Sequence, residues 1–373
     1  MKKNFQLLVL AILISGCDKN VNDVEIVNCE TDNSIDVVTS RSFNMGFSTW
    51  PYGPDESDKT ETYQFIEQHA DIYSEQIDDK IPWNSLINNT SLPSEFENDI
   101  DFRQRKKIDN HKLLLSVSLL NSDRSDLLED YDGSIPNYSA LNDKIIENAY
   151  YKHLEYLIAA FSPDYLVFAM EVNDLKLKSE QKWIEYKLLA ENIRLRLNSD
   201  YPSLQISESV TLHNFYNPEV SNPNDYIDEL SDYINTNSDF AAISFYPFFK
   251  GLHTKSEFQQ AFDFLHGQIN IPIAFVETTH IAETLQIPSI DLSIPSDICE
   301  QKDYLELILL NAYNNNYKFI IWWAYRDFDE LWETFPDEYQ DLGKLWRDTG
   351  LLNEDEEERP SYNIWQIVYN LKK

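Results

Sequence analysis

Short apolar runs alternate with longer amphipathic stretches along most of this 373-residue chain. The runs are rich in β-branched and aromatic residues and end at polar positions, a pattern typical of buried strands. Eight of them are expected to be strands: Phe43–Ser48, Asp71–Ile77, Lys112–Leu119, Tyr165–Met170, Leu204–Val210, Phe240–Tyr246, Ile271–Val276 and Phe319–Trp323. The clearest helical patterns cover Asp143–Ala160, Glu180–Leu197, Lys255–Ile269, Tyr304–Asn314 and Ser361–Leu371.

Strands that alternate with helices predict right-handed βαβ units and a parallel sheet. Eight strands in one domain of residues 42–373 favour an α/β fold of the TIM-barrel type, a (β/α)8 barrel. The alternative is an open, doubly wound sheet, which normally carries a glycine-rich phosphate turn after its first strand. The chain has only 8 glycines and no such motif, so we expect the barrel.

The N-terminus has a different pattern, MKKNFQLLVLAILISGCDKN, in which two lysines precede a short apolar run and a small-residue pair. This pattern predicts a signal peptide over residues 1–16, since the run is too short to span a bilayer. The segment Leu13–Cys17 resembles the lipobox of bacterial lipoproteins, which implies cleavage before Cys17 and acylation of that residue. The alternative is a buried N-terminal helix. We expect a lipid-anchored protein of the cell envelope, with the membrane as a partner of Cys17 and residues 17–41 as a polar, flexible tether.

Composition narrows the function classes. Lys and Arg number 30 against 64 Asp and Glu, a net charge of −34, which repels phosphate backbones and argues against nucleic-acid binding. No Cys or His cluster has the spacing of metal ligands, so we expect no metal and no cofactor. Cys29 and Cys299 are expected to remain unpaired, with a disulfide between them as the alternative in an oxidising compartment. The 8 Trp, 22 Tyr and 20 Phe predict a large core and rings available to stack on sugars.

Active sites of (β/α)8 barrels lie at the carboxyl ends of the strands. Glu171 is the first charge after the fourth run, and Glu277 is the first after the seventh. Strand alternation places Val167 and Ala169 on the face of Glu171, and Ile273 and Phe275 on the face of Glu277. Two carboxyls at one mouth are what glycosidic cleavage needs, one as proton donor and one as nucleophile. Glu75 and Glu208 are rival carboxylates, which we expect to be ion-paired instead.

These residues resemble those of retaining (β/α)8-barrel glycoside hydrolases, which carry an acid/base Glu after the fourth strand and a nucleophile Glu after the seventh. Within that clan the chain is most similar to the arabinogalactan endo-β-1,4-galactanases of family 53. The similar segments are Asp239–Gly251 with its Tyr246-Pro247 pair, Ile271–Thr278, the strand that ends Trp322-Trp323, and Thr349–Tyr362. The resemblance implies that Glu171 is the acid/base and Glu277 the nucleophile.

The chain also departs from the clan. Met170 stands where the clan has an Asn, the run Asp71–Asp78 lacks the clan's Arg, and the third run lacks its His. Further candidates at the mouth follow from position after a strand: Trp50, Tyr52, Trp83, Asn173, His213, Tyr246, His280, Trp323 and Tyr325, of which Asn173 could supply the missing amide only if its loop turns it inward.

Two functions are consistent with these features. The first is an O-glycoside hydrolase that degrades a plant or algal polysaccharide, with a β-galactan as one candidate, by double displacement through Glu171 and Glu277. The second is a surface glycan-binding lipoprotein that has kept the barrel without catalysis. Both have a carbohydrate as partner, and hydrolysis is the property that separates them.

Overall fold

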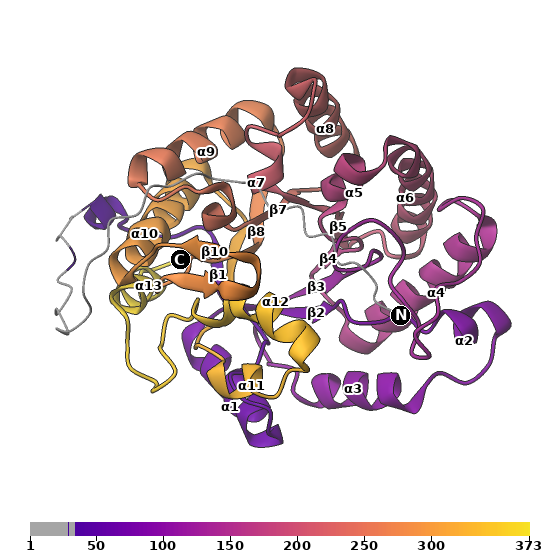
Figure 1. Cartoon of the computed structure of the whole chain (residues 1–373), viewed down its shortest axis with the longest axis horizontal. Helices are drawn as coiled ribbons and strands as arrows, with labels where there is room; N and C mark the ends of the chain where they lie inside the picture. The colour runs from indigo at the N-terminus through magenta and orange to yellow at the C-terminus, as the bar shows by residue number, and fades with distance from the viewer. Residues whose placement is uncertain (1–28, 30–33) are drawn as a thin grey trace.

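The computed structural model describes Cys29 and residues 34–373 (Figure 1). The predicted signal peptide and Cys17 lie outside the described residues. Nine parallel strands form one sheet in the order β5-β4-β3-β2-β1-β11-β8-β7-β6. They are β1 (Asn44–Ser48), β2 (Ile72–Ile77), β3 (Lys112–Val117), β4 (Tyr165–Val167), β5 (Gln205–Ser207), β6 (Ser209–Thr211), β7 (Ala241–Phe245), β8 (Ile273–Thr278) and β11 (Phe319–Trp322).

The sheet closes into a barrel through the fifth predicted run. That run is divided at Glu208 into β5, which pairs with β4, and β6, which pairs with β7. The first and last strands, β1 and β11, pair along Asn44–Phe47 and Phe319–Trp322. Each of the eight predicted runs therefore supplies one stave, and the expected (β/α)8 barrel is confirmed.

Helices surround the barrel (Figure 1). The predicted helices correspond to α4, α6, α9, α10 and α13, and α10 begins at Ile298, earlier than the pattern indicated. The helices are α1 (Glu56–His69), α2 (Trp83–Asn88), α3 (Ser94–Arg105), α4 (Lys144–Phe161), α5 (Val172–Lys178), α6 (Glu180–Asp200), α7 (Leu212–Phe215), α8 (Pro223–Asn237), α9 (Lys255–Gln268), α10 (Ile298–Asn315), α11 (Asp329–Trp332), α12 (Asp337–Arg347) and α13 (Pro360–Tyr369). An antiparallel hairpin, β9 (Leu285–Ile287) with β10 (Leu292–Ile294), and the short 3-10 helices Ser34–Val37, Pro247–Lys250 and Pro288–Ile290 complete the order.

Two apolar layers hold the barrel together. A large cluster packs the outer face of the sheet against the helices, and a smaller one fills the interior with residues such as Ile72, Val167, Phe240 and Ile321. Gly46 allows β1 and β2 to approach closely, because a Cβ atom there would lie 1.9 Å from the carbonyl oxygen of Ile72. The interior is therefore a packed core, and open space is left to the mouth.

The expected alternation along the fourth and seventh staves is wrong. Regular β4 ends at Val167, and Ala169 turns outward to the helix layer before Glu171 adopts a left-handed backbone with φ of 54°. Ile273 and Phe275 also face the helices, and a register shift opposite Val276 brings Glu277 round to the mouth. Each glutamate thus reaches the mouth through a local irregularity.

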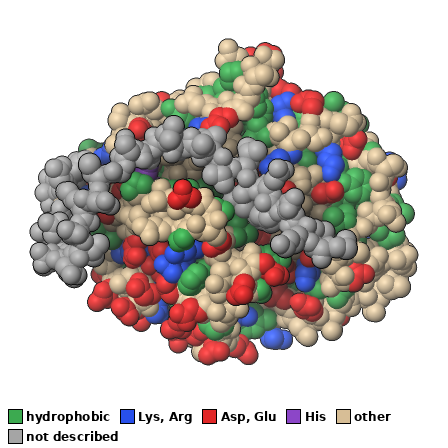
Figure 2. Space-filling view, viewed as in Figure 1, with side chains coloured by type: hydrophobic (Ala, Val, Ile, Leu, Met, Phe, Trp, Pro, Cys, Tyr) green, Lys and Arg blue, Asp and Glu red, His purple; other side chains and the backbone are tan. Residues whose placement is uncertain are grey.

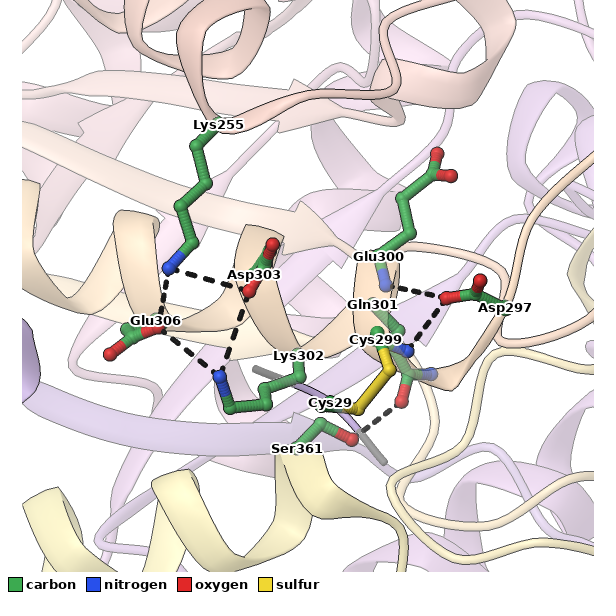
Figure 3. The surroundings of a disulfide bond; sticks show 10 residues. All are labelled: Cys29, Lys255, Asp297, Cys299, Glu300, Gln301, Lys302, Asp303, Glu306 and Ser361. Carbon is green, nitrogen blue, oxygen red and sulfur yellow. Dashed lines mark hydrogen bonds and ion pairs between the residues drawn. A yellow bond between two sulfur atoms is a disulfide. The ribbon is translucent and has the colours of Figure 1, made fainter. Parts of the chain in front are cut away.

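The segment before β1 also differs from expectation. Ile35 and Val38 are buried in the core, and Arg41 pairs with Asp71, so these residues belong to the folded body although we expected a tether up to residue 41. Cys29 forms a disulfide with Cys299 near the start of α10, which corrects the expectation of two unpaired cysteines (Figure 3). The pairing could not be read from the sequence, because the two residues are 270 positions apart.

The exterior is strongly acidic, as the composition predicted. Asp and Glu side chains gather most densely over the lower left of the face shown in Figure 2. Among the described residues, no helix is both long enough and apolar enough to cross a membrane.

The disulfide should stabilise the fold measurably. It restricts a very long loop in the unfolded chain, so replacing Cys29 and Cys299 together by Ser should lower the free energy of unfolding by about 2–4 kcal/mol. Urea unfolding of the two purified proteins checks this. Dithiothreitol should lower the midpoint of the wild type and leave the double variant unchanged; equal midpoints for both proteins would contradict the stabilising role.

Candidate active site

A cavity of about 390 Å³ opens at the carboxyl ends of the strands. Its polar wall contains Gln76 of β2, Glu171 after β4, Glu277 of β8, and Arg124 from the connection between β3 and α4. The opposite wall is largely apolar and comes mainly from the loop after β11, with contributions from Phe328, Phe335, Tyr339, Leu342 and Trp346. A second hollow of about 260 Å³ shares Trp50, Gln76, Asp78, Trp323 and Phe335 with the first, so the two are continuous.

Glu171 is surrounded by hydrogen-bond donors. The Arg124 guanidinium donates to its Oε2 through Nη2 at 2.8 Å and Nε at 3.2 Å, and the Ser244 hydroxyl donates to Oε1 at 2.6 Å. The Glu171 N–H donates to Ser209 Oγ at 2.8 Å, which fixes the backbone at the left-handed turn. Both carboxyl oxygens therefore have partners that favour the ionised form.

Glu277 lies in a different environment. Its Oε2 accepts a hydrogen bond from Gln76 Nε2 at 3.0 Å, and its Oε1 accepts one from the Tyr246 hydroxyl. In the β7–β8 ladder its Cα partner is Ser244, the residue that also holds Glu171. Ser244 therefore holds the Glu171 carboxyl from the strand position next to the backbone of Glu277.

The pKa values of the two glutamates are shifted in opposite directions. Burial raises the pKa of Glu171, but the charge of Arg124 and the bonds from Ser244 and Arg124 outweigh it and hold the pKa below its usual value. Burial raises the pKa of Glu277 well above its usual value, and the charges of Glu171 and Asp78 add to the effect.

Two further titratable groups line the cavity near Glu171. Burial, followed by the charge of Glu171, raises the pKa of Asp174 to about 6, although Thr211 and Asn214 both donate to its Oδ1. Burial lowers the pKa of His213 to about 4, so its imidazole is neutral at pH 7.

The structure brings some of the predicted residues to the cavity and not others. Trp50, His213, Tyr246 and Trp323 line it together with the two glutamates. Those that do not line it are Tyr52, Trp83, Asn173, His280 and Tyr325.

Asn173 was predicted to contact substrate and to supply the missing amide only if its loop turned it inward, and its contacts show that it is not turned to the cavity. The side chain is fully buried, and its Oδ1 and Nδ2 bond to the backbone and hydroxyl of Thr211. Trp83 donates to the Leu128 carbonyl from within the core, and His280 is buried among aromatic rings beside Glu300. A residue that follows a strand can point into the protein as well as into the cavity. These three side chains point into the protein, where their contacts are structural.

The rival carboxylates are ion-paired, as expected. Glu75 accepts hydrogen bonds from Arg103, Tyr63 and Thr49. Glu208 is paired with Arg194 and accepts hydrogen bonds from two tyrosines. Neither glutamate lines the main cavity.

Among the residues that the sequence did not single out are Gln76, Arg124 and Trp346, which line the cavity, and Ser244, which holds Glu171. Gln76 lies four positions after the interior-facing Ile72 along β2, so strand alternation places both side chains on the same face and could have identified Gln76. Arg124 lies in the connection between β3 and α4, which carries no periodic signal, whereas Trp346 lies on the amphipathic helix α12, whose periodicity could have indicated a buried face.

Several donors at the cavity have no partner within the described chain. The indole Nε1 of Trp50, Trp323 and Trp346 and the Nδ1 of His213 are enclosed and make no hydrogen bond there. Enclosed polar atoms of this kind normally find a partner, so the cavity suits a ligand with several oxygen acceptors.

Among the described residues, carboxylates that could hold a cation cluster around Asp327 with Glu283 and Glu354, or with Asp329 and Asp348. Asp327 is already paired with Arg359 at 2.7 Å and accepts from the Gly350 N–H. The guanidinium of Arg359 therefore already balances the charge of Asp327, the residue common to both groups.

Comparisons with known proteins identify the fold. No family model and no curated protein matches the chain. Among solved structures, the Ignisphaera aggregans GH53 catalytic domain aligns with 94% of this chain and 99% of its own, at 16% identity and a TM-score of 0.56. A GH5_18 structure from Bifidobacterium longum subsp. longum in complex with Manβ1-4GlcNAc aligns with 88% of this chain and 78% of its own, at 12% identity and a TM-score of 0.62.

Xylanase 10B from Thermotoga maritima aligns with 90% of this chain and 97% of its own, at 13% identity and a TM-score of 0.56. The chain shares the (β/α)8-barrel fold of these glycoside hydrolases. The predicted resemblance is confirmed at the level of the fold, since identities this low show the fold alone.

Glu277→Gln should stabilise the protein at neutral pH. The pKa of Glu277 is raised on folding, so this carboxyl lowers the free energy of unfolding as the pH rises above 4.5, the usual pKa of a glutamate. The amide of Gln does not titrate and removes that penalty. We expect the Tm to rise by about 2 °C at pH 7.5 and to be unchanged at pH 4. Thermal unfolding at both pH values checks this, with Glu229→Gln as a control that should lower the Tm. Burial raises the pKa of Glu229, but the hydrogen bonds from Lys176, Lys187 and Trp183 outweigh it and hold the pKa at about 2.

Proposed function

We propose that the chain is an O-glycoside hydrolase that acts on a plant or algal polysaccharide, with a β-galactan as one candidate. The observation that carries the proposal is that the carboxyls of Glu171 and Glu277 line one cavity, with Ser244, the register partner of Glu277, bonded to Glu171. A pair of carboxyls on either side of a glycosidic bond can protonate the leaving oxygen and attack the anomeric carbon. Double displacement with retention follows from the strand positions of the pair and remains a prediction.

The other walls of the cavity support a sugar as ligand. Trp50 and Trp323 form a tilted ring pair with centroids 5.3 Å apart, and such rings offer flat faces for the C–H side of a pyranose. The unpartnered indole and imidazole nitrogens match the hydroxyl oxygens of a sugar. The solved structures of similar fold include two fungal β-1,4-galactanases, which supports galactan as the first substrate to test.

The alternative is a surface protein that binds glycan without cleaving it. Met170 stands where the clan has an Asn, and it faces the barrel interior, where it cannot contact a sugar hydroxyl. Gln76, a neutral residue, occupies the contact to Glu277. These features favour the alternative, and the retained pair of glutamates favours the enzyme.

Replacing either glutamate by Gln should abolish hydrolysis while leaving binding intact. The amide keeps the shape and can neither donate the proton nor form the covalent intermediate, so turnover of polysaccharide should fall at least about 10³-fold. Reducing-sugar release from galactans, mannans, glucans and algal polysaccharides measures this, with Glu208→Gln as a control outside the cavity. A wild type that binds these glycans and hydrolyses none establishes the binding protein instead.

We also propose that the protein is anchored in the cell envelope through acylated Cys17. The disulfide supports export, since such bonds persist in oxidising compartments. Cys17→Ala should abolish incorporation of labelled palmitate and partition into the detergent phase. Unchanged membrane association of that variant would contradict the anchor.

A further inference from the structure

Arg124, the arginine that lines the cavity, is paired with Glu171, the glutamate to which the clan resemblance assigns the role of proton donor. Arg124 comes from the connection between β3 and α4 and contacts Glu171 through two nitrogens. The second strand, where the clan has an arginine, carries none here, and its Gln76 contacts Glu277. The arginine of this cavity is thus bonded to Glu171, and a neutral amide is bonded to Glu277.

Arg124 is held firmly in this position. Its Nη1 donates to Ser118 Oγ and to the carbonyls of Leu120 and Asn121, so the loop fixes the guanidinium on the side away from Glu171. The Asn121 side chain in turn accepts from two backbone N–H groups of the same loop, at residues 125 and 126. The ion pair is therefore part of a fixed network, unlike a loose surface contact.

Within the part of the chain that the structure describes, no cation is bonded to Glu277. Its two hydrogen-bond donors, Gln76 and Tyr246, are neutral. The other titratable groups that line the main cavity are the carboxyls of Asp78, Asp174 and Glu171, together with Tyr339, neutral His213 and the already paired Arg124. The adjoining hollow adds Lys59, Tyr63, Asp99 and Arg103, of which Arg103 is paired with Glu75 and Asp99. A second carboxylate at Glu277 would add negative charge to a site that already has an excess of it.

We infer that Arg124 is a positioning residue that keeps Glu171 ionised and leaves the proton of the pair on Glu277, so that the two glutamates exchange the roles implied by their strand positions. The inference rests on the proposed function for its catalytic part. The opposite pKa directions of the two carboxyls support it.

The exchanged reaction balances without any further reagent. Glu171 attacks the anomeric carbon while the bond from that carbon to the leaving oxygen breaks, and Glu277 gives its proton to that oxygen. Water then attacks the glycosyl–Glu171 ester, its proton passes to Glu277, and Glu171 leaves as a carboxylate. The substrate must therefore present its anomeric carbon to Glu171 and its glycosidic oxygen to Glu277.

The first test locates the proton without a substrate. Carboxyl ¹³C resonances of protein labelled at the Glu side-chain carboxyl carbon are titrated by NMR, and Glu171→Gln and Glu277→Gln each identify one signal by its loss. Glu277 should titrate at a higher pH than Glu171, and the reverse order overturns the inference.

Variants of Arg124 test the cause. Arg124 lowers the pKa of both carboxyls but is bonded only to Glu171, so Arg124→Met should raise the midpoint of Glu171 more than that of Glu277 and narrow the gap between them. Arg124→Lys should restore the wild-type gap, and Arg196→Met on the outer helix α6 should change neither midpoint. Midpoints unchanged in a folded Arg124→Met protein overturn the assignment, and the wild-type titration decides the location of the proton even if that variant does not fold.

The second test assigns the roles, with 2,4-dinitrophenyl and phenyl glycosides of galactose, mannose, glucose and xylose as probes. Glu277→Gln should lose about 10²–10⁴-fold on phenyl glycosides and less than about tenfold on dinitrophenyl glycosides, which need little protonation. Glu171→Gln should lose at least about 10³-fold on both. The opposite pattern overturns the exchange. A wild type inactive on every probe and polysaccharide refutes the proposed function, while the NMR order still decides where the proton lies.

Discussion

Closure of the parallel sheet is the constraint on which the site depends. The pairing of β1 with β11, and the division of one stave into β5 and β6, leave no free edge in the sheet. All strands then end at the same mouth, which brings together glutamates from distant parts of the sequence. The interior core from Ile72 to Ile321 fills the barrel below them, so the polar groups are confined to one end.

The two glutamates depend on departures from regular strand geometry. Glu171 has a positive φ that a non-glycine residue adopts at a cost of roughly 1–3 kcal/mol. Glu277 follows a register shift in the β7–β8 ladder. Hydrogen bonds from Ser244 and to Ser209 hold Glu171 in this conformation, so the surrounding barrel compensates for the strain at the mouth.

The sequence predicts the regular part of this structure well, because apolar periodicity reports burial. All eight staves and five helices follow from it, whereas α1 and α3 are too polar to give the same signal. Alternation failed at Glu171 and Glu277 for the reason given above: irregular backbone breaks the period. Arg124 and the disulfide of Cys29 could not be predicted, since loop direction and pairing across most of the chain leave no periodic trace.

The electrostatics of the cavity follow from the cost of burying like charges. Two carboxylates in one enclosed site require either a cation or a proton for compensation. Arg124 is the cation for Glu171, and its Nη1 donors are engaged by the β3–α4 loop. The net charge of −34 on the whole chain contributes a negative potential that further favours protonation of the second carboxyl. Because Arg124 is bonded to Glu171 and keeps it charged, that charge adds to burial in raising the pKa of Glu277.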